Sequence, residues 1–167
     1  MNDTQKQHQT SELQLVTFEL AGEEFAIDIL KVQEINRILE ITTIPRSPAW
    51  IHGVMNLRGK IIPVVDLRNR FSLPPADRTR ESRIVVVEVA DKTLGFLVDR
   101  VNEVLRISAS TVEPPPPMVA GVDSRFIQGV GKRDSRLFIL LDLDMLLGQD
   151  MLEALNDVEQ VKEPALV

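Results

Sequence analysis

The sequence is short of several residue types that functional sites commonly use. Its 167 residues include no cysteine, no tyrosine, one tryptophan and two histidines. Without thiols there can be no disulfide, no thiolate nucleophile and no cysteine-based zinc or iron–sulfur site. So few aromatic side chains also leave little surface for stacking against single-stranded nucleic acid. We therefore expect no cofactor and no metal.

Positive charge is in deficit. Lys and Arg number 19 and Asp and Glu 25, so the formal charge is 19 − 25 = −6. Because binding to a phosphate backbone needs a net basic face, no nucleic-acid partner is expected. The one local basic cluster is interleaved with carboxylates, as solvated segments are; it comprises Arg68, Arg70, Arg78, Arg80 and Arg83.

Long apolar runs are also missing. No stretch approaches the ~18 residues that a membrane-spanning helix needs. Residues 1–12 are polar and lack the apolar region of a signal peptide. These features predict a cytoplasmic protein that does not insert into a membrane and has a disordered N-terminus over 1–12.

β-Branched residues are abundant, and they predict a mostly β fold. Val occurs 19 times and Ile 13 times, together 32 of 167 residues. They lie in short runs such as 60–65 and 83–89, which turn residues separate. Helical signals are confined to single turns at 48–52 and 67–71 and to 143–156, where Leu147, Met151 and Leu155 share a face.

The chain divides into two blocks of similar size. Residues 13–71 and 83–147 are strand-rich, and the polar segment 72–82 with its Pro-Pro pair is a linker or crossover. An acidic helix or tail follows over 149–167.

The two blocks resemble each other. Ile51-His52-Gly53-Val54 matches Ile127-Gln128-Gly129-Val130, and Asp66 matches Asp142; both offsets are 76, from 129 − 53 and 142 − 66. Val32-Gln33-Glu34-Ile35 matches Val101-Asn102-Glu103-Val104 at an offset of 69. The two offsets differ by 76 − 69 = 7 residues, and this insertion lies in the proline-rich loop 107–124. We interpret the chain as a duplicated small β unit, which predicts two packed barrels with a groove between them.

Catalytic signatures are weak. His52 has no serine and aspartate partners suggested nearby, so a surface or capping role is favoured over that of a base. Asp142 and Asp144 could pair as carboxylates, but Asp is common in the first turn of a helix. A small ligand-binding or hydrolytic barrel that uses Asp66 or Asp142 stays as an alternative, and a deep closed pocket would favour it.

The most specific motif of the chain is Asn56-Leu57-Arg58-Gly59 with its flanks. With this motif the sequence resembles the CheW family of bacterial chemotaxis coupling proteins over about residues 13–148. In the first half the similar residues are 25–35, 43–45, Pro48, Ile51, Gly53, Val54, 56–59, Ile61, Pro63, Val64, 66–68 and Phe71; in the second they are Gly95, Val98, Asp99, Val101, Val104, the proline loop, Gly129, Val130 and 140–142.

This resemblance implies a fold and a role. The fold is two intertwined five-stranded SH3-like barrels around a shared core, the first approximately 13–71 and the second approximately 83–147, with a short C-terminal helix. The role is that of a scaffold without enzymatic activity. It would couple the helical signalling tips of transmembrane chemoreceptors to the regulatory domain of the histidine kinase CheA, within membrane-associated arrays. Another receptor–kinase array, such as one for twitching motility, is an alternative.

Site residues follow from the same comparison and from charge. Glu34 and Arg58 each stand among apolar strand residues, where a charge is costly unless it is paired, so we expect an ion pair that is structural, receptor-facing or both. Met118, which follows four prolines, and Glu113 are the expected kinase contacts. The receptor groove is predicted from small, apolar and paired residues, for which core packing is the competing interpretation: Val32, Glu34, Ile35, Gly53, Val54, Leu57, Arg58, Gly95, Val101 and Val104.

Overall fold

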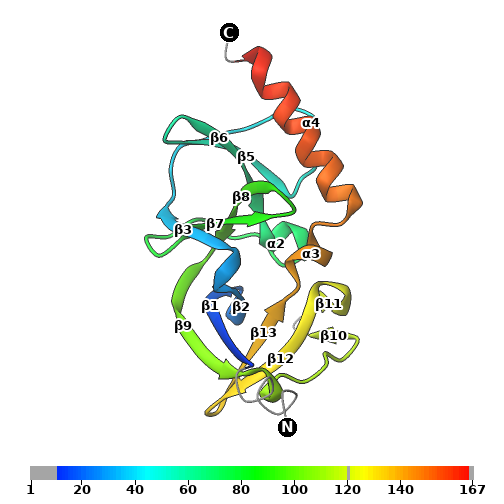
Figure 1. Ribbon diagram of the computed structural model, residues 1–167. Helices are drawn as coiled ribbons and strands as arrows, with labels where there is room; N and C mark the ends of the chain where they lie inside the picture. Colours follow the sequence, from blue (N-terminus) through cyan, green and yellow to red (C-terminus); the bar gives the residue numbers. More distant parts are fainter. Residues whose placement is uncertain (1–10, 120, 166–167) are drawn as a thin grey trace.

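The structure is a computed structural model that describes residues 11–119 and 121–165 (Figure 1). Strands dominate it, and the longer helix lies at the C-terminal end. The strands are β1 (Glu12–Leu20), β2 (Glu23–Asp28), β3 (Val32–Arg37), β4 (Ile41–Thr42), β5 (Ile51–Leu57), β6 (Lys60–Asp66), β7 (Arg83–Val89), β8 (Lys92–Val98), β9 (Arg100–Ser108), β10 (Met118–Val119), β11 (Val122–Asp123), β12 (Ile127–Arg133) and β13 (Arg136–Leu141). The helices are α2 (Leu67–Arg70), α3 (Leu143–Leu146) and α4 (Gln149–Ala165), with 3₁₀ turns η1 (Ile29–Lys31), η2 (Ala109–Thr111) and η3 (Ser124–Phe126).

Two curved sheets form the two predicted barrels. Barrel A has the strand order β12-β13-β2-β1-β9, and barrel B has the order β3-β7-β8-β6-β5 with the short β4 beside β5. Both orders follow one pattern, because β1, β2, β9, β12 and β13 in barrel A occupy the places of β7, β8, β3, β5 and β6 in barrel B. The expected intertwined double barrel is confirmed.

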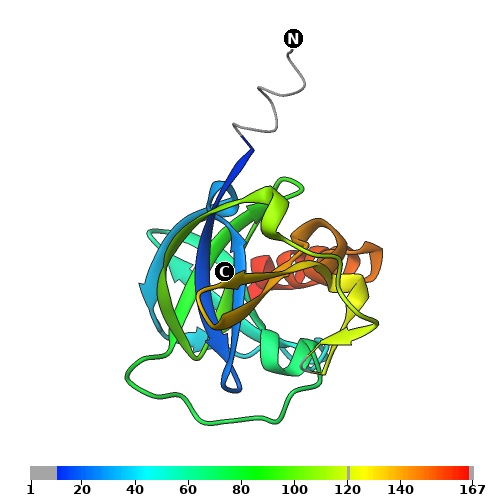
Figure 2. The same cartoon turned by 90° about the horizontal axis from the view of Figure 1, so that it is seen from below.

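Neither barrel coincides with one block of the sequence. The N-terminal hairpin β1–β2 joins strands of the second block, and β7–β8 joins strands of the first. Each block therefore donates its first hairpin to the other barrel, so 13–71 and 83–147 are sequence repeats and not spatial units. The linker 72–82 carries the chain from α2 to β7 as an extended loop, which can be followed in green in Figure 2.

The duplication is visible in the pairing. β6 runs parallel to β8 with Val64 opposite Gly95, and β13 runs parallel to β2 with Leu140 opposite Ala26. The offsets of 76 and 69 relate these two pairs, since 64 + 76 = 140 and 95 − 69 = 26.

Three apolar clusters hold the molecule together. The largest lies between the barrels and includes Val16, Phe18, Val85, Val87 and the apolar face of α4. Barrel A has its own small core of Leu15, Ala26, Leu105, Phe138 and Leu140. Barrel B has a matching core of Met55, Ile62, Val64, Ile84 and Val86.

The ends of the chain differ in part from expectation. Ser11 and Glu12 were expected to be disordered, but the carbonyl oxygen of Ser11 accepts from the backbone N–H of Ala109 at 2.9 Å, and Glu12 begins β1 opposite Ser108. Residues 1–10 of that prediction lie outside the described residues. The expected C-terminal helix breaks near Gly148 into α3 and α4. Met151 and Leu155 are nevertheless fully buried on one face, as predicted.

Two further expectations have different outcomes. The expected turn at 67–71 is the helix α2. The one at 48–52 is a single hydrogen-bonded turn, in which the backbone N–H of Ile51 donates to the carbonyl oxygen of Pro48 at 3.0 Å, and β5 begins at Ile51. Within the described part of the chain, no helix is long and apolar enough to cross a membrane.

Candidate functional site

The site is built on two strands that repeat one another. β3 and the residue after it read Val-Gln-Glu-Ile-Asn-Arg-Ile (32–38), and the matching part of β9 reads Val-Asn-Glu-Val-Leu-Arg-Ile (101–107). Figure 1 shows β3 and β9 on the same side of the molecule, one in each barrel. Only the first four residues of this repeat, 32–35 and 101–104, were recognised from the sequence.

A β-bulge at the same place in both strands sets the direction of the side chains. In barrel B, Val32 lies opposite Val87 and Glu34 opposite Val86, which leaves Gln33 as the extra residue. In barrel A the register shifts between Val16 and Phe18. Because a bulge inserts one extra residue, the residues before and after it, Val32 and Glu34, point to opposite faces of the sheet. Val32 and Ile35 therefore share a face, although they are three residues apart.

The hydroxyl of Thr17 fixes the bulge in barrel A. It donates to the carbonyl oxygen of Glu103 and accepts from the backbone N–H of the same residue, both at 3.1 Å. Thr17 is fully buried. Val86 is its counterpart in barrel B, so there the bulge forms without a hydroxyl.

The bulges place four apolar side chains on the outer edges of the central core. Val32 and Ile35 pair with Val87 and Val85 of that core, and Val101 and Val104 pair with Phe18 and Val16. Val32 and Val101 pack partly against the core, whereas Ile35 is 41% and Val104 52% exposed. We call these four residues the apolar rim: Val32, Ile35, Val101 and Val104.

The expected ion pair between Glu34 and Arg58 is present. Both guanidinium Nη atoms of Arg58 contact the Glu34 carboxylate, Nη1 at 3.0 Å from Oε1 and Nη2 against Oε2. These hydrogen bonds hold the pKa of the Glu34 carboxyl below its ordinary value. The pair is not buried, because the side chain of Arg58 is 71% exposed at the β5–β6 turn. The apolar strand residues around the two charges therefore do not bury the pair.

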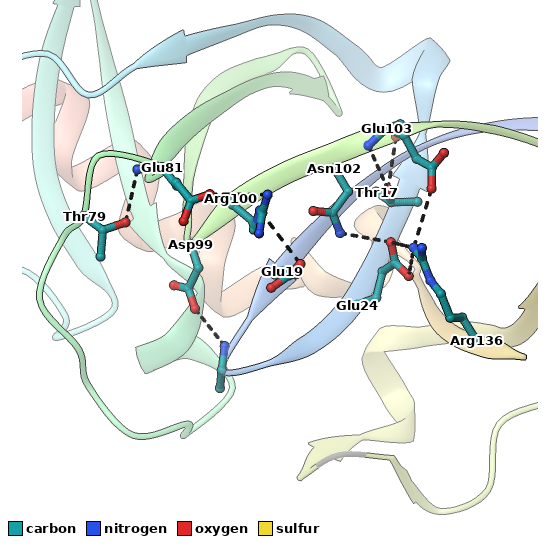
Figure 3. Close-up of polar contacts among 11 residues, drawn as sticks. Thr17, Glu19, Glu24, Thr79, Glu81, Asp99, Arg100, Asn102, Glu103 and Arg136 are labelled. Atoms are coloured by element: carbon teal, nitrogen blue, oxygen red, sulfur yellow. Dashed lines mark hydrogen bonds and ion pairs between the residues drawn. The ribbon is translucent and has the colours of Figure 1, made fainter.

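Barrel A has an equivalent charged pair that the sequence analysis missed (Figure 3). Glu103, the counterpart of Glu34, lies 3.5 Å from Arg136 at the start of β13. Arg136 also donates to both carboxylate oxygens of Glu24 at 2.7 Å, and Asn102 donates to Glu24 at 3.0 Å. Only the repeat of Glu34 at Glu103 could have indicated this cluster, since Arg136 has a lysine, Lys60, at its matching position.

Four other predicted groove residues lie inside barrel B or the central core. A Cβ on Gly95 would lie 2.6 Å from Ile84, and one on Gly53 would lie 2.3 Å from the carbonyl oxygen of Thr42. Both glycines therefore make close packing possible and do not line a groove. Val54 is buried in the central core, and Leu57 packs against the core of barrel B.

The proline-rich loop presents Met118 to solvent. Met118 begins β10 and is 61% exposed, so it does not fold back over the barrel. Glu113 is exposed and exchanges two backbone hydrogen bonds with Val130 of β12, at 2.9 and 2.8 Å. The base of the loop is thus tied to barrel A.

The candidate catalytic residues have structural partners. Asp66 accepts from the backbone N–H of Asn69 at the start of α2, and Asp142 accepts from that of Met145 at the start of α3. The ring Nε2 of His52 lies 2.6 Å from Arg78 of the linker. Burial, and then the charge of Arg78, lower the pKa of His52. Among the described residues, no group of acidic or histidine side chains could hold a metal ion.

Comparison with known proteins identifies the family. A model of the CheW-like domain matches residues 14–151. The chain belongs to the CheW-like domain family. The matched range covers both barrels, the apolar rim and the first residues of α4, so the whole candidate site lies within the CheW-like domain.

Similar proteins are found across distant bacteria. "Chemotaxis protein CheW" of Treponema pallidum is 36% identical over 153 residues, which cover 88% of this chain and 89% of that protein. "Probable chemotaxis protein CheW" of Rhizobium etli is 34% identical over 141 residues, covering 84% and 91%. The crystal structure of the scaffolding protein TtCheW from Thermoanaerobacter tengcongensis matches with a TM-score of 0.77 and 40% identity, covering 83% of this chain and 90% of that one.

Proposed function

We propose that this chain is a cytoplasmic adaptor of bacterial chemotaxis that couples transmembrane chemoreceptors to the histidine kinase CheA. It would hold both proteins within a membrane-associated array by binding alone, with no catalytic step, no cofactor and no nucleic acid. The apolar rim carries this proposal. A helical receptor tip with an apolar stripe is a natural ligand for such a surface.

Exposure of the rim is the physical argument for a partner there. Ile35 and Val104 are β-branched, lie on the core-facing sides of their sheets and yet stay 41% and 52% exposed. Covering them with an apolar helix face would gain roughly 25 cal/mol per Å² of apolar surface removed from water. The Glu34–Arg58 pair would then border the covered surface.

A second, separate face is proposed for the kinase. Met118 lies on the β10–β11 hairpin, and in both views this hairpin is on the side of the molecule away from β3 and β9 (Figures 1 and 2). A bridge must hold two partners at once, so two distant surfaces support the adaptor role. Met118 would be the apolar anchor and Glu113 the neighbouring contact for the regulatory domain of CheA.

The test is to disable the two faces one at a time. Val104→Gln should weaken binding of a receptor cytoplasmic signalling fragment by more than about fivefold, the cost expected of an interface anchor, and leave binding of the CheA regulatory domain unchanged. Met118→Asp should do the opposite, because a carboxylate is costly to desolvate at an apolar contact. Titration calorimetry of each variant with each partner gives the four affinities.

Matched controls come from the same chain. Met145 is 54% exposed and belongs to neither proposed face. Met145→Gln and Met145→Asp should therefore bind both partners like the unchanged protein. If Val104→Gln and Met118→Asp weaken both partners equally while circular dichroism shows an intact fold, the two-face adaptor is wrong.

A further inference from the structure

The apolar rim ends in an arginine in both barrels. Arg37 lies two residues beyond Ile35 on β3, and Arg106 lies two residues beyond Val104 on β9. Two residues of a strand span about 7 Å, and side chains two apart share a face. Both arginines are exposed. The offset of 69 that relates Val32 to Val101 also relates Arg37 to Arg106.

Neither arginine is neutralised within the described chain. Arg37 lies directly opposite Arg83 in the β3–β7 pair, an arrangement of like charges that is unfavourable by itself. Arg83 donates to the backbone carbonyls of Arg80 and Ser82 at 2.7 and 2.8 Å, and no carboxylate within the described ranges forms an ion pair with Arg37 or Arg83.

Arg106 is opposite an uncharged residue. Its Nε and Nη2 donate to the side-chain oxygen of Gln14, at 2.9 and 3.1 Å, when that amide is turned to satisfy both groups. Because Gln14 is uncharged, these hydrogen bonds do not neutralise the guanidinium of Arg106, which can still form an ion pair with a partner's carboxylate. Most other arginines contrast with this, for example Arg68 with Asp99 and Arg136 with Glu24.

From this arrangement we infer that the receptor-binding rim selects a helical partner whose apolar stripe is flanked by carboxylates at both ends. The inference rests on the proposed docking of a receptor tip and adds its charge pattern. The apolar middle would bury the stripe, and Arg37 and Arg106 would each pair with an acidic side chain on either side of it. In a protein with a formal charge of −6, two arginines without a carboxylate partner at the ends of the apolar rim provide electrostatic complementarity and orientation.

Charge reversal at each end tests the inference. Arg37→Glu and Arg106→Glu should each weaken binding of the receptor signalling fragment about threefold to tenfold at low ionic strength, mainly through a slower association rate. The loss should shrink as salt is raised from roughly 0.03 to 0.3 M, because exposed charges are screened. Stopped-flow titration measures both rates. Arg37→Gln and Arg106→Gln, which remove the charge without reversing it, should each give a smaller loss of affinity than the corresponding change to Glu.

Lys132→Glu is the matched control. Lys132 is an exposed cation on β12, so its reversal changes the net charge equally but away from the rim. If the Arg37 and Arg106 variants bind like Lys132→Glu while Val104→Gln still weakens the receptor fragment, the charge pattern is wrong and the docking site stands. If Val104→Gln also has no effect, the docking site itself is wrong. If the arginine variants change self-association in sedimentation and leave receptor binding unchanged, the occupant is a second copy and the inference is overturned.

Discussion

One pair of facing residues in barrel A can be replaced by the pair at the matching positions of barrel B, and we expect the protein to tolerate this only when both residues are replaced together. Gly131 lies directly opposite Phe138 in the β12–β13 hairpin, and Met55 lies directly opposite Ile62 at the matching place in β5–β6. A Cβ on Gly131 would lie 2.1 Å from the ring of Phe138, which is 1% exposed. The aromatic ring thus fills, from across the strand pair, the space that the Met55 side chain occupies in barrel B.

The single changes should each be destabilising. Gly131→Met places a Cβ 2.1 Å from the buried ring and so forces the ring to move by more than an ångström, and overpacking of this kind costs about 1–3 kcal/mol. Phe138→Ile leaves a cavity over the glycine and should cost about 1–2 kcal/mol. For a chain of this length, each kcal/mol lowers Tm by roughly 2–4 °C. The double variant Gly131→Met with Phe138→Ile copies barrel B and should recover most of the loss.

Urea denaturation of the four proteins gives the coupling free energy between the two positions. We expect the double variant to be more stable than the sum of the two single changes by about 1–3 kcal/mol, the range seen for residues in contact. Val64→Ala, in the separate core of barrel B, is the control, since it should add independently to Phe138→Ile. Additive behaviour of Gly131 and Phe138 would refute the equivalence of the two hairpins.

Three further predictions concern charged groups. Arg58→Ala should change Tm by no more than about 2 °C in a thermal melt followed by circular dichroism, because its pair with Glu34 is exposed; a larger fall would mean that the pair supports the barrel. Burial disfavours the charge of Glu24, but the hydrogen bonds it accepts outweigh this and lower its pKa. Its ionised form therefore adds stability above the unfolded-state pKa of about 4.3, which is lost as pH falls through the lower folded-state value. Glu24→Gln should flatten the acid side of the pH–stability curve, and an unchanged curve would contradict this. The pKa of His52 measured by NMR should lie below its ordinary value of about 6.5, and Arg78→Ala should raise it. Because the folded-state pKa is lowered, the stability that goes with neutral His52 is fully present above the unfolded-state pKa and is lost as pH falls through the folded-state pKa.

The fold could be predicted from sequence further than the site could. Repeated motifs and β-branched runs indicate a duplicated β protein, but they carry no sign of the hairpin exchange, because strand pairing is decided by tertiary packing. The ion pair of Glu34 with Arg58 could be predicted because a charge among apolar residues is costly unless an opposite charge pairs with it. Its exposure was not, because a hairpin turn such as that at Arg58 lifts side chains away from the strands. The glycines at 53 and 95 were assigned to a groove since small residues permit both close packing and an open cleft, and only the positions of Thr42 and Ile84 decide between these.

The hairpin exchange means that neither half of the chain should form the apolar rim alone. β3, in the first half, is paired with β7 of the second half, and β9 is paired with β1 of the first. A fragment of residues 1–76 keeps β3 but loses β7 and β8, the strands between β3 and β6 in barrel B. A fragment of residues 77–167 keeps β9 and loses β1 and β2. Each exposes both edges of a broken sheet and part of the central core.

We therefore expect each fragment alone to give no cooperative thermal melt and no binding of the receptor fragment. An equimolar mixture should recover both, since the cut falls in the linker 72–82 and breaks no strand. Circular dichroism and titration of the separate and mixed fragments make the comparison. The uncut protein and a mixture in which one fragment carries Val104→Gln are the controls, and the latter should refold without binding. A cooperative melt from either fragment by itself would show that a block can form its own barrel, and would contradict the exchange.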